Sequence, residues 1–224
     1  MTADEVRAVL AGKIPTEALL RRFAPARGLH AVHLFILSGR AVPEDLAPLE
    51  AASAQWAAST VTDAVRLPAA GRCEVLKLIR SLPQEERRFG FAPKPPVPLT
   101  GGPGAWVVGM LQCRNLNWMG MAKVVAFVTP TYLSAASYGV IASGRKELTP
   151  RLVTDFAALL GIDARELALL TGVSLREVPP PPSPEAADAA DAAALLWEAR
   201  RLTAAQARHV SEVARSLRRD SPGG

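Results

Sequence analysis

Hydrophobic positions recur with helical spacing in the segment that follows Thr149. Large apolar side chains fall on one face of an α-helix there, with smaller or polar residues between them. Thr149 offers an oxygen for the helix N-cap, Pro150 suits the first helical turn, and Gly161 suits the left-handed residue that ends a helix. The pattern predicts a helix over residues 150–160. Its apolar positions are Leu152, Val153, Phe156, Leu159 and Leu160.

The same periodicity predicts helices through most of the chain, and the alternating β-branched runs that indicate strands are hard to find. In the centre, the other predicted helices cover residues 106–115, 118–128, 132–143 and 164–170. Earlier helices are predicted over residues 2–10, 16–23, 29–37 and 73–83, with one or two more within 42–65. Capping boxes mark three helix starts. They are the pairs Thr2 and Glu5, Asp163 and Glu166, and Thr203 and Gln206.

Two stretches rich in proline divide the chain. Residues 93–104, PKPPVPLTGGPG, are too dense in proline and glycine for a helix or a strand, and residues 177–184, EVPPPPSP, favour extended polyproline. We therefore expect three helical parts separated by two linkers. They are an N-terminal domain over residues 1–92, a central domain over 105–176, and a helical hairpin with its tail over 185–224.

A repeated unit links the first two parts. Residues 14–40 and 119–145 align without gaps at six identities in 27 positions, and Ser38-Gly39-Arg40 matches Ser143-Gly144-Arg145. The identities fall where turns and helix ends constrain residue choice, so we interpret them as a decayed tandem duplication. Two unrelated helical hairpins with a common C-cap remain the alternative. In the first copy the stretch LHAVHLFIL is almost wholly apolar, which predicts packing against a partner subunit or against residues 50–90.

Composition and charge narrow the class of protein. Hydrophobic residues make up 49% of the 224-residue chain and aromatic residues only 5%, which favours an all-α fold with a substantial core. The net charge of +5 is spread along the chain without a basic arm, so it would help a polyanion approach but does not demonstrate one. No signal peptide or membrane-spanning apolar run is found, so we expect a cytoplasmic protein that does not contact a membrane.

Candidate chemistry is absent from the sequence. Cys73 and Cys113 stand forty residues apart without a CxxC motif, and His30 and His33 have no third metal ligand nearby. Phosphate-binding, dinucleotide-binding, zinc-protease and serine-hydrolase motifs are also missing. We expect neither an enzyme nor a metal or other cofactor.

The central domain carries a recognisable order of motifs. A helix ends in Ser143-Gly144-Arg145-Lys146, a new helix starts at Thr149-Pro150, and that helix ends in Leu160-Gly161-Ile162. With Ala122-Lys123 upstream and Glu166-Leu167 downstream, this order resembles the helix-turn-helix domain of Cro/C1-type (XRE-like) repressors, and the layout is similar to actinobacterial regulators of that kind. The resemblance implies two helix-turn-helix domains, the first of them degenerate, and a sequence-specific regulator that binds double-stranded DNA as a homodimer.

The resemblance and the residue types together predict the DNA-contacting positions. Arg145 and Lys146 lie where phosphate contacts would fix the register of the protein on a duplex. The predicted helix over residues 132–143, the third of the central domain, lacks Arg, Gln and Asn. Hydroxyls, methyl groups and DNA shape would therefore have to carry base recognition. Its candidates, with two residues from the preceding helix, are Thr131, Tyr132, Ser134, Ser137, Tyr138, Asn117 and Lys123.

A second function fits the same sequence. The predicted helices over residues 29–37 and 132–143 are poor in side chains that read bases, and the tail has no net charge. The chain would then be a helical adaptor whose helix-turn-helix units no longer bind DNA. Its protein partner would bind through residues 1–50 or 185–220.

Overall fold

The computed structural model describes residues 15–88, 90–92, 97, 101–175 and 183–220. Across these residues the chain forms eleven α-helices and two short 3-10 helices and no β-strand, which confirms the all-α prediction. The predicted helix over residues 2–10, with its Thr2 and Glu5 capping box, lies outside the described residues. No described helix is both long enough and apolar enough to cross a membrane.

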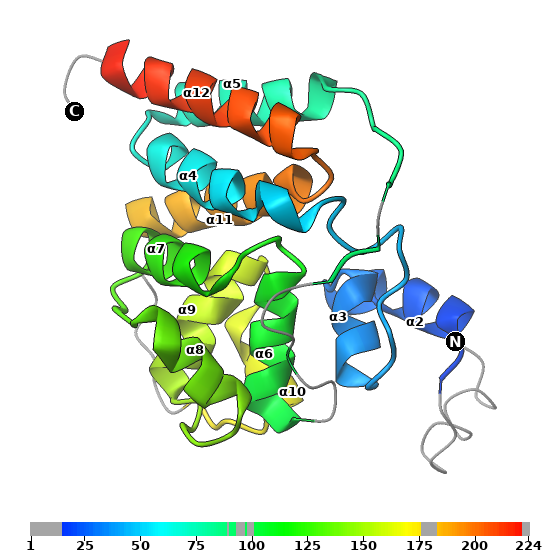
Figure 1. The fold of residues 1–224 in the computed structure, drawn as a ribbon. Coiled ribbons are helices and arrows are strands. Elements are labelled where there is room, and N and C mark those ends of the chain that lie inside the picture. Colours follow the sequence, from blue (N-terminus) through cyan, green and yellow to red (C-terminus); the bar gives the residue numbers. More distant parts are fainter. Residues whose placement is uncertain (1–14, 89, 93–96, 98–100, 176–182, 221–224) are drawn as a thin grey trace.

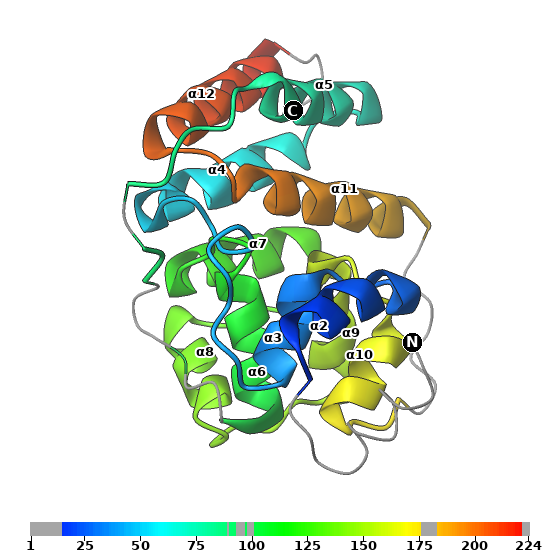
Figure 2. The same ribbon diagram turned by 90° about the vertical axis from the view of Figure 1, so that its right-hand side faces the viewer.

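The helices stack in layers, as Figure 1 and Figure 2 show. The upper layer holds α5 (Ala69–Ser81) and α12 (Ala204–Asp220), and the layer beneath it holds α4 (Ala54–Ala64) and α11 (Ser183–Ala199). The remaining helices form the broad base of the molecule. They are α2 (Glu17–Phe23), α3 (Ala31–Leu37), α6 (Gly102–Gln112), α7 (Trp118–Val128), α8 (Ala135–Ala142), α9 (Pro150–Leu160) and α10 (Ala164–Thr171).

Packing crosses the domain boundaries expected from the sequence. A single cluster of buried apolar residues runs through all the layers, because α12 packs on α4 and α5 while α11 packs on α5, α9 and α4. The two arms of the predicted C-terminal hairpin therefore pack mainly on other helices. Arg72 of α5 pairs with Asp188 and Asp191 of α11 at 2.7 and 2.6 Å, and Arg218 of α12 donates to Asp63 of α4 at 3.0 Å.

The helix ends follow local sequence closely. Thr149 accepts a hydrogen bond from the N–H of Leu152, and the Thr203 and Gln206 capping box is formed in both directions. Two linker bounds are wrong, since α6 begins at Gly102, inside the predicted 93–104 linker, and α11 begins at Ser183, inside the predicted 177–184 linker. Pro103 occupies the first turn of α6, where the missing N–H of proline removes no helical hydrogen bond.

The two copies of the repeated unit share one turn. Gly39 and Gly144 both adopt left-handed conformations, with φ of 67° and 72°. In each copy the preceding serine hydroxyl donates to the carbonyl three residues earlier at 3.0 Å, and the following arginine N–H donates to the carbonyl five residues earlier. The connections that enter the second helix differ, because a 3-10 turn over Pro25–Arg27 leads toward α3 and an extended segment leads to α8. The likeness is therefore concentrated at the helix end.

Helix α6 lies between α3 and α8, which are the second helices of the two copies (Figure 1). Ile36 of α3 and Ile141 of α8 are equivalent in the alignment, and each faces a glycine of α6. A Cβ added at Gly104 would overlap the carbonyl oxygen of Ile141, whereas one added at Gly109 would lie 3.6 Å from the Ile36 side chain, an ordinary contact. The first copy thus packs on α6, whereas the sequence suggested a partner subunit or residues 50–90.

A buried arginine joins the copies to the tail. Arg114, which follows α6 and is 1% exposed, donates to the carbonyl of Leu160 at the end of α9. Its guanidinium lies 4.5 Å from the ring centroid of Trp197 in α11, and Nη2 lies 3.5 Å from Nε2 of His33. The His30 ring also belongs to this cluster and stacks on the Trp197 ring, with 3.6 Å between the two ring centroids.

This cluster holds its histidines neutral. No carboxylate of the described residues pairs with Arg114, and burial lowers its pKa only to about 9, so the guanidinium stays charged at neutral pH. Burial first, and the charge of Arg114 second, lower the pKa of His33 well below its usual value and that of His30 to about 3. Because a guanidinium can only donate, Nε2 of His33 is the acceptor in this contact.

The close approach of α6 and α8 predicts unequal effects of two alanine substitutions. Gly104→Ala should lower the free energy of unfolding by about 1–3 kcal/mol, because the backbone of α8 has to move. Gly109→Ala is the matched control. It adds the same methyl group to the same helix and should leave stability unchanged or raise it by up to about 1 kcal/mol. Urea unfolding of both variants measures the difference, and equal values would contradict the packing.

The buried histidines predict a loss of stability in mild acid. The unfolded chain takes up protons below about pH 6.5 and folded His33 does not, so stability present above that pH falls as the pH drops. The slope for His33 alone approaches about 1.4 kcal/mol per pH unit as the pH falls well below 6.5. The free energy of unfolding, measured between pH 7 and 5, should show this slope. The His33→Gln substitution should reduce the slope. An unchanged slope in that variant, or an equal reduction by His209→Gln on the exposed face of α12, would contradict the assignment.

Candidate nucleic-acid interface

The predicted interface is built on three consecutive helices. Helix α7 ends at Val128, an extended segment leads from Thr129 to Ser134, and α8 packs against both α7 and α6. Gly144 then reverses the chain toward Thr149, which caps α9. This order presents a corner between α8 and α9 to solvent, because every residue from Ser143 to Glu147 is exposed.

Tyr138 is not available for base contact. Its side chain is fully buried, and its ring lies 6.2 Å from that of Phe156. Burial raises the pKa of its hydroxyl, and that hydroxyl has no hydrogen-bond partner among the described residues. The prediction that Tyr138 reads DNA is therefore wrong, since the inner face of α8 carries it into the core.

Two further predicted residues have structural roles. The Thr131 hydroxyl donates to Asp155 of α9 and so fixes the α7–α8 connection to that helix. Asn117 caps α7, because its Oδ1 accepts from the N–H of Gly120 at 2.8 Å. Both side chains are partly buried and engaged in holding the backbone, which leaves them less suited to DNA contact than their sequence positions suggested.

The remaining predicted residues separate into two surfaces. Lys123, Tyr132 and Ser134 line an open groove of about 570 Å³ between α4, α7 and the start of α8, which we name the α4–α7 groove. Arg145 and Lys146 lie at the opposite end of α8, on the exposed corner. The structure thus brings Lys123, Tyr132 and Ser134 together, but it places Arg145 and Lys146 apart from them.

The corner collects positive charge beside a helix start. Arg145 and Lys146 are exposed, and Nε of Arg145 donates to the Ser143 hydroxyl at 3.0 Å. Thr149 and Arg151 lie at the exposed start of α9, where the helix dipole favours an anion. Thr149 already caps the N–H of Leu152, and Nε of Arg151 lies 3.4 Å from the carboxylate of Asp155. Arg151 was missed in the sequence, although its place in the first turn after a capping threonine could have identified it.

The outward face of α8 carries small side chains. Ala136 is exposed, while Ser137 and Val140 are half-buried. The hydroxyls of Ser134 and Ser137 lie 3.0 Å apart, and they are the hydrogen-bonding groups that this face offers. Such a face can approach a duplex closely, but it lacks the amide or guanidinium side chains that make two hydrogen bonds to one base.

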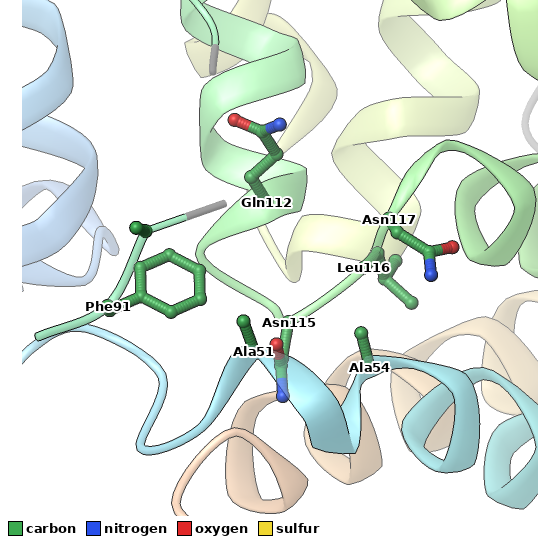
Figure 3. Close-up of a pocket in the computed structure, with 8 residues that line it drawn as sticks. Ala51, Ala54, Phe91, Gln112, Asn115, Leu116 and Asn117 are labelled. Carbon is green, nitrogen blue, oxygen red and sulfur yellow. The ribbon is translucent and has the colours of Figure 1, made fainter. Parts of the chain in front are cut away.

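A smaller cavity lies where α6 turns into α7. It has a volume of about 300 Å³, and Figure 3 shows the ring of Phe91 and the side chains of Ala51 and Ala54 around it. Asn115, the one described non-glycine residue with a left-handed φ (56°), donates to the carbonyl of Glu50 at 2.9 Å. Its amide is therefore held by the backbone, and the cavity walls offer mainly apolar contacts.

The burial of Tyr138 predicts the effect of removing its hydroxyl. Tyr138→Phe should leave the free energy of unfolding unchanged or raise it by about 1 kcal/mol, because an unpaired buried polar group is lost without creating a cavity. DNA binding should equal that of the parent chain. Thermal unfolding and a DNA-binding isotherm measure both quantities. A change in selected DNA sequence would show that Tyr138 reaches the duplex.

Comparison with known proteins adds no relative. No protein-family model matches the chain, and neither a curated protein nor a solved structure matches it.

Proposed function

We propose that the chain is a transcriptional regulator of the Cro/C1-like helix-turn-helix type and binds double-stranded DNA through α8 and the α8–α9 corner. The observation that carries this proposal is the exposed corner itself. Arg145, Lys146 and Arg151 are exposed there at the N-terminus of α9; Glu147 lies between them in the sequence, and Asp155 lies 3.4 Å from Nε of Arg151. Backbone N–H groups and basic side chains at a helix start are suited to phosphate oxygens.

Contacts to DNA divide by chemistry. Arg145, Lys146 and Arg151 would neutralise phosphates and set the position of the protein, while the outward face of α8 lies in the major groove. Ser134 and Ser137 offer hydroxyls to base edges, and Val140 and Ala136 offer apolar contact to thymine methyl groups. Because these groups discriminate weakly, the shape and deformability of the DNA carry much of the specificity.

The first copy supports the DNA-binding surface but does not form a second DNA-binding surface. Every residue of α3 is buried or half-buried in the folded chain, so that helix cannot enter a groove of DNA. It packs on α6, which in turn backs α8. Two-fold pairing of the whole chain would give a site with half-sites about 34 Å apart.

The adaptor function keeps one observation in its favour. The α4–α7 groove exposes Met119, Phe127 and Tyr132, which are apolar or aromatic side chains that protein interfaces favour. That groove and the basic corner lie at different ends of α8. An adaptor role can therefore exist beside DNA binding, and each surface can be tested separately.

Replacing Arg145 and Lys146 together by alanine tests the DNA proposal. The double variant should bind all duplexes more weakly, because phosphate contacts carry little sequence information. The slope of log K against log salt should fall by about 0.9 for each phosphate contact that is lost. Fluorescence anisotropy with a labelled mixed-sequence duplex at several salt concentrations measures both quantities.

The matched control removes two exposed arginines from another surface. Arg208 and Arg219 lie on α12, in the layer farthest from α8, and their double alanine variant has the same net charge as the test variant. It should retain the affinity and salt slope of the parent. Equal loss in both variants, or a parent chain that binds no duplex, would overturn the assignment of the corner.

A further inference from the structure

The α4–α7 groove concentrates the exposed apolar surface of the described chain. Four large hydrophobic side chains are exposed among the described residues, and three of them line this groove. Met119 is 70% exposed, Phe127 44% and Tyr132 86%. Exposed apolar side chains scattered singly need no explanation, but three around one depression of about 570 Å³ indicate a surface that another molecule covers.

The stripe along α7 has the spacing of a helix-binding site. Met119, Lys123 and Phe127 follow each other at intervals of four residues, so they lie on one side of α7. At 1.5 Å per residue, Met119 and Phe127 are separated by about 12 Å along the helix axis. Apolar residues seven or eight positions apart on a second helix cover the same length. A helix lying along α7 can therefore contact both ends of the stripe.

The charge of the groove selects the kind of helix. Lys123 is the one charged side chain in the lining, and the Arg66 guanidinium lies 4.4 Å from the ring centroid of Phe127 at its edge. The nearest carboxylate along α4, that of Asp63, is held by Arg215 and Arg218 at 3.7 and 3.0 Å and so does not offset these charges. The rim is therefore cationic around an apolar floor.

We propose that the α4–α7 groove binds an acidic amphipathic helix of a partner protein. Its apolar residues at positions i and i+7 pack on Met119 and Phe127, and a carboxylate midway between them meets Lys123. A second copy of this chain fits less well, because two-fold pairing across the groove would bring one cationic rim against another. DNA fits less well too, since phosphates would lie against apolar side chains.

This inference goes beyond DNA binding and depends on different charged and large apolar residues, while Ser134 borders both surfaces. The groove uses Lys123, midway along α7, and the corner uses Lys146, after the end of α8, and both lysines are exposed. A glutamate at either position makes the same change of net charge. Each substitution therefore serves as the control for the other.

The test uses the full chain and two synthetic helical peptides of 18 residues. Both carry leucine at helical i, i+3, i+4 and i+7 spacing. The acidic probe has glutamate at its polar positions, and the basic probe has lysine there. Anisotropy of the labelled peptides should show binding of the acidic probe and at least tenfold weaker binding of the basic probe. Lys123→Glu should weaken the acidic probe at least tenfold and strengthen the basic one.

Further variants separate the possible outcomes. Met119→Ser with Phe127→Ser should weaken the acidic probe at least tenfold while leaving DNA affinity unchanged, and both side chains are exposed, so folding should persist in circular dichroism. Lys146→Glu should weaken DNA binding and leave the peptide bound. No binding of the acidic probe, or equal loss in the Lys123 and Lys146 variants, would overturn the proposal. A parent chain that self-associates in sedimentation, and loses this with Phe127→Ser, would assign the groove to a second copy instead.

Discussion

The structure depends on one buried charge. Arg114 has almost no exposure, yet it meets a backbone carbonyl, an imidazole and the face of an indole contributed by helices from three parts of the sequence. Arg200 approaches the same Trp197 ring, at 3.5 Å from its centroid. A desolvated contact between a guanidinium and an aromatic ring contributes on the order of 2 kcal/mol, and loss of the ring would leave a buried charge with fewer partners. The first copy, the central helices and the tail are therefore held as one body.

That constraint accounts for the different exposure of α3 and α8. In the first copy, His30 and His33 face the arginine and the indole, so α3 is committed to the core. In the second copy the equivalent helix keeps one face in solvent, because Tyr138 and Ile141 bury only its inner side. Helix α6 packs on both, and Gly104 lets the backbone of α8 approach it closely. Helix α3 thus lies in the core, while α8 keeps an exposed face.

Two surfaces remain open on this rigid body, and they differ in chemistry. The α8–α9 corner is basic and polar, which suits phosphates, while the α4–α7 groove is apolar with a cationic rim, which suits an acidic amphipathic helix. Both lie on the α7–α8 unit, so a protein bound in the groove would lie close to DNA held at the corner. Helix α4, from the layer that it forms with α11 (Figure 1), supplies one wall of the groove.

The sequence by itself determined the local structure: the helices of the central domain, their caps at Thr149 and Asp163, and the turn at Gly144 all depend on residues within a few positions of each other. The exposed basic pair could be found for the same reason, because it follows a helix-ending glycine. Only the tertiary structure decided which apolar residues of α7 face outward, since that helix is apolar on most sides and distant helices choose its buried face. It also decided that Tyr138 points inward and that α11 and α12 of the tail complete the two layers that hold α4 and α5 (Figure 1), because those contacts join residues far apart in the chain.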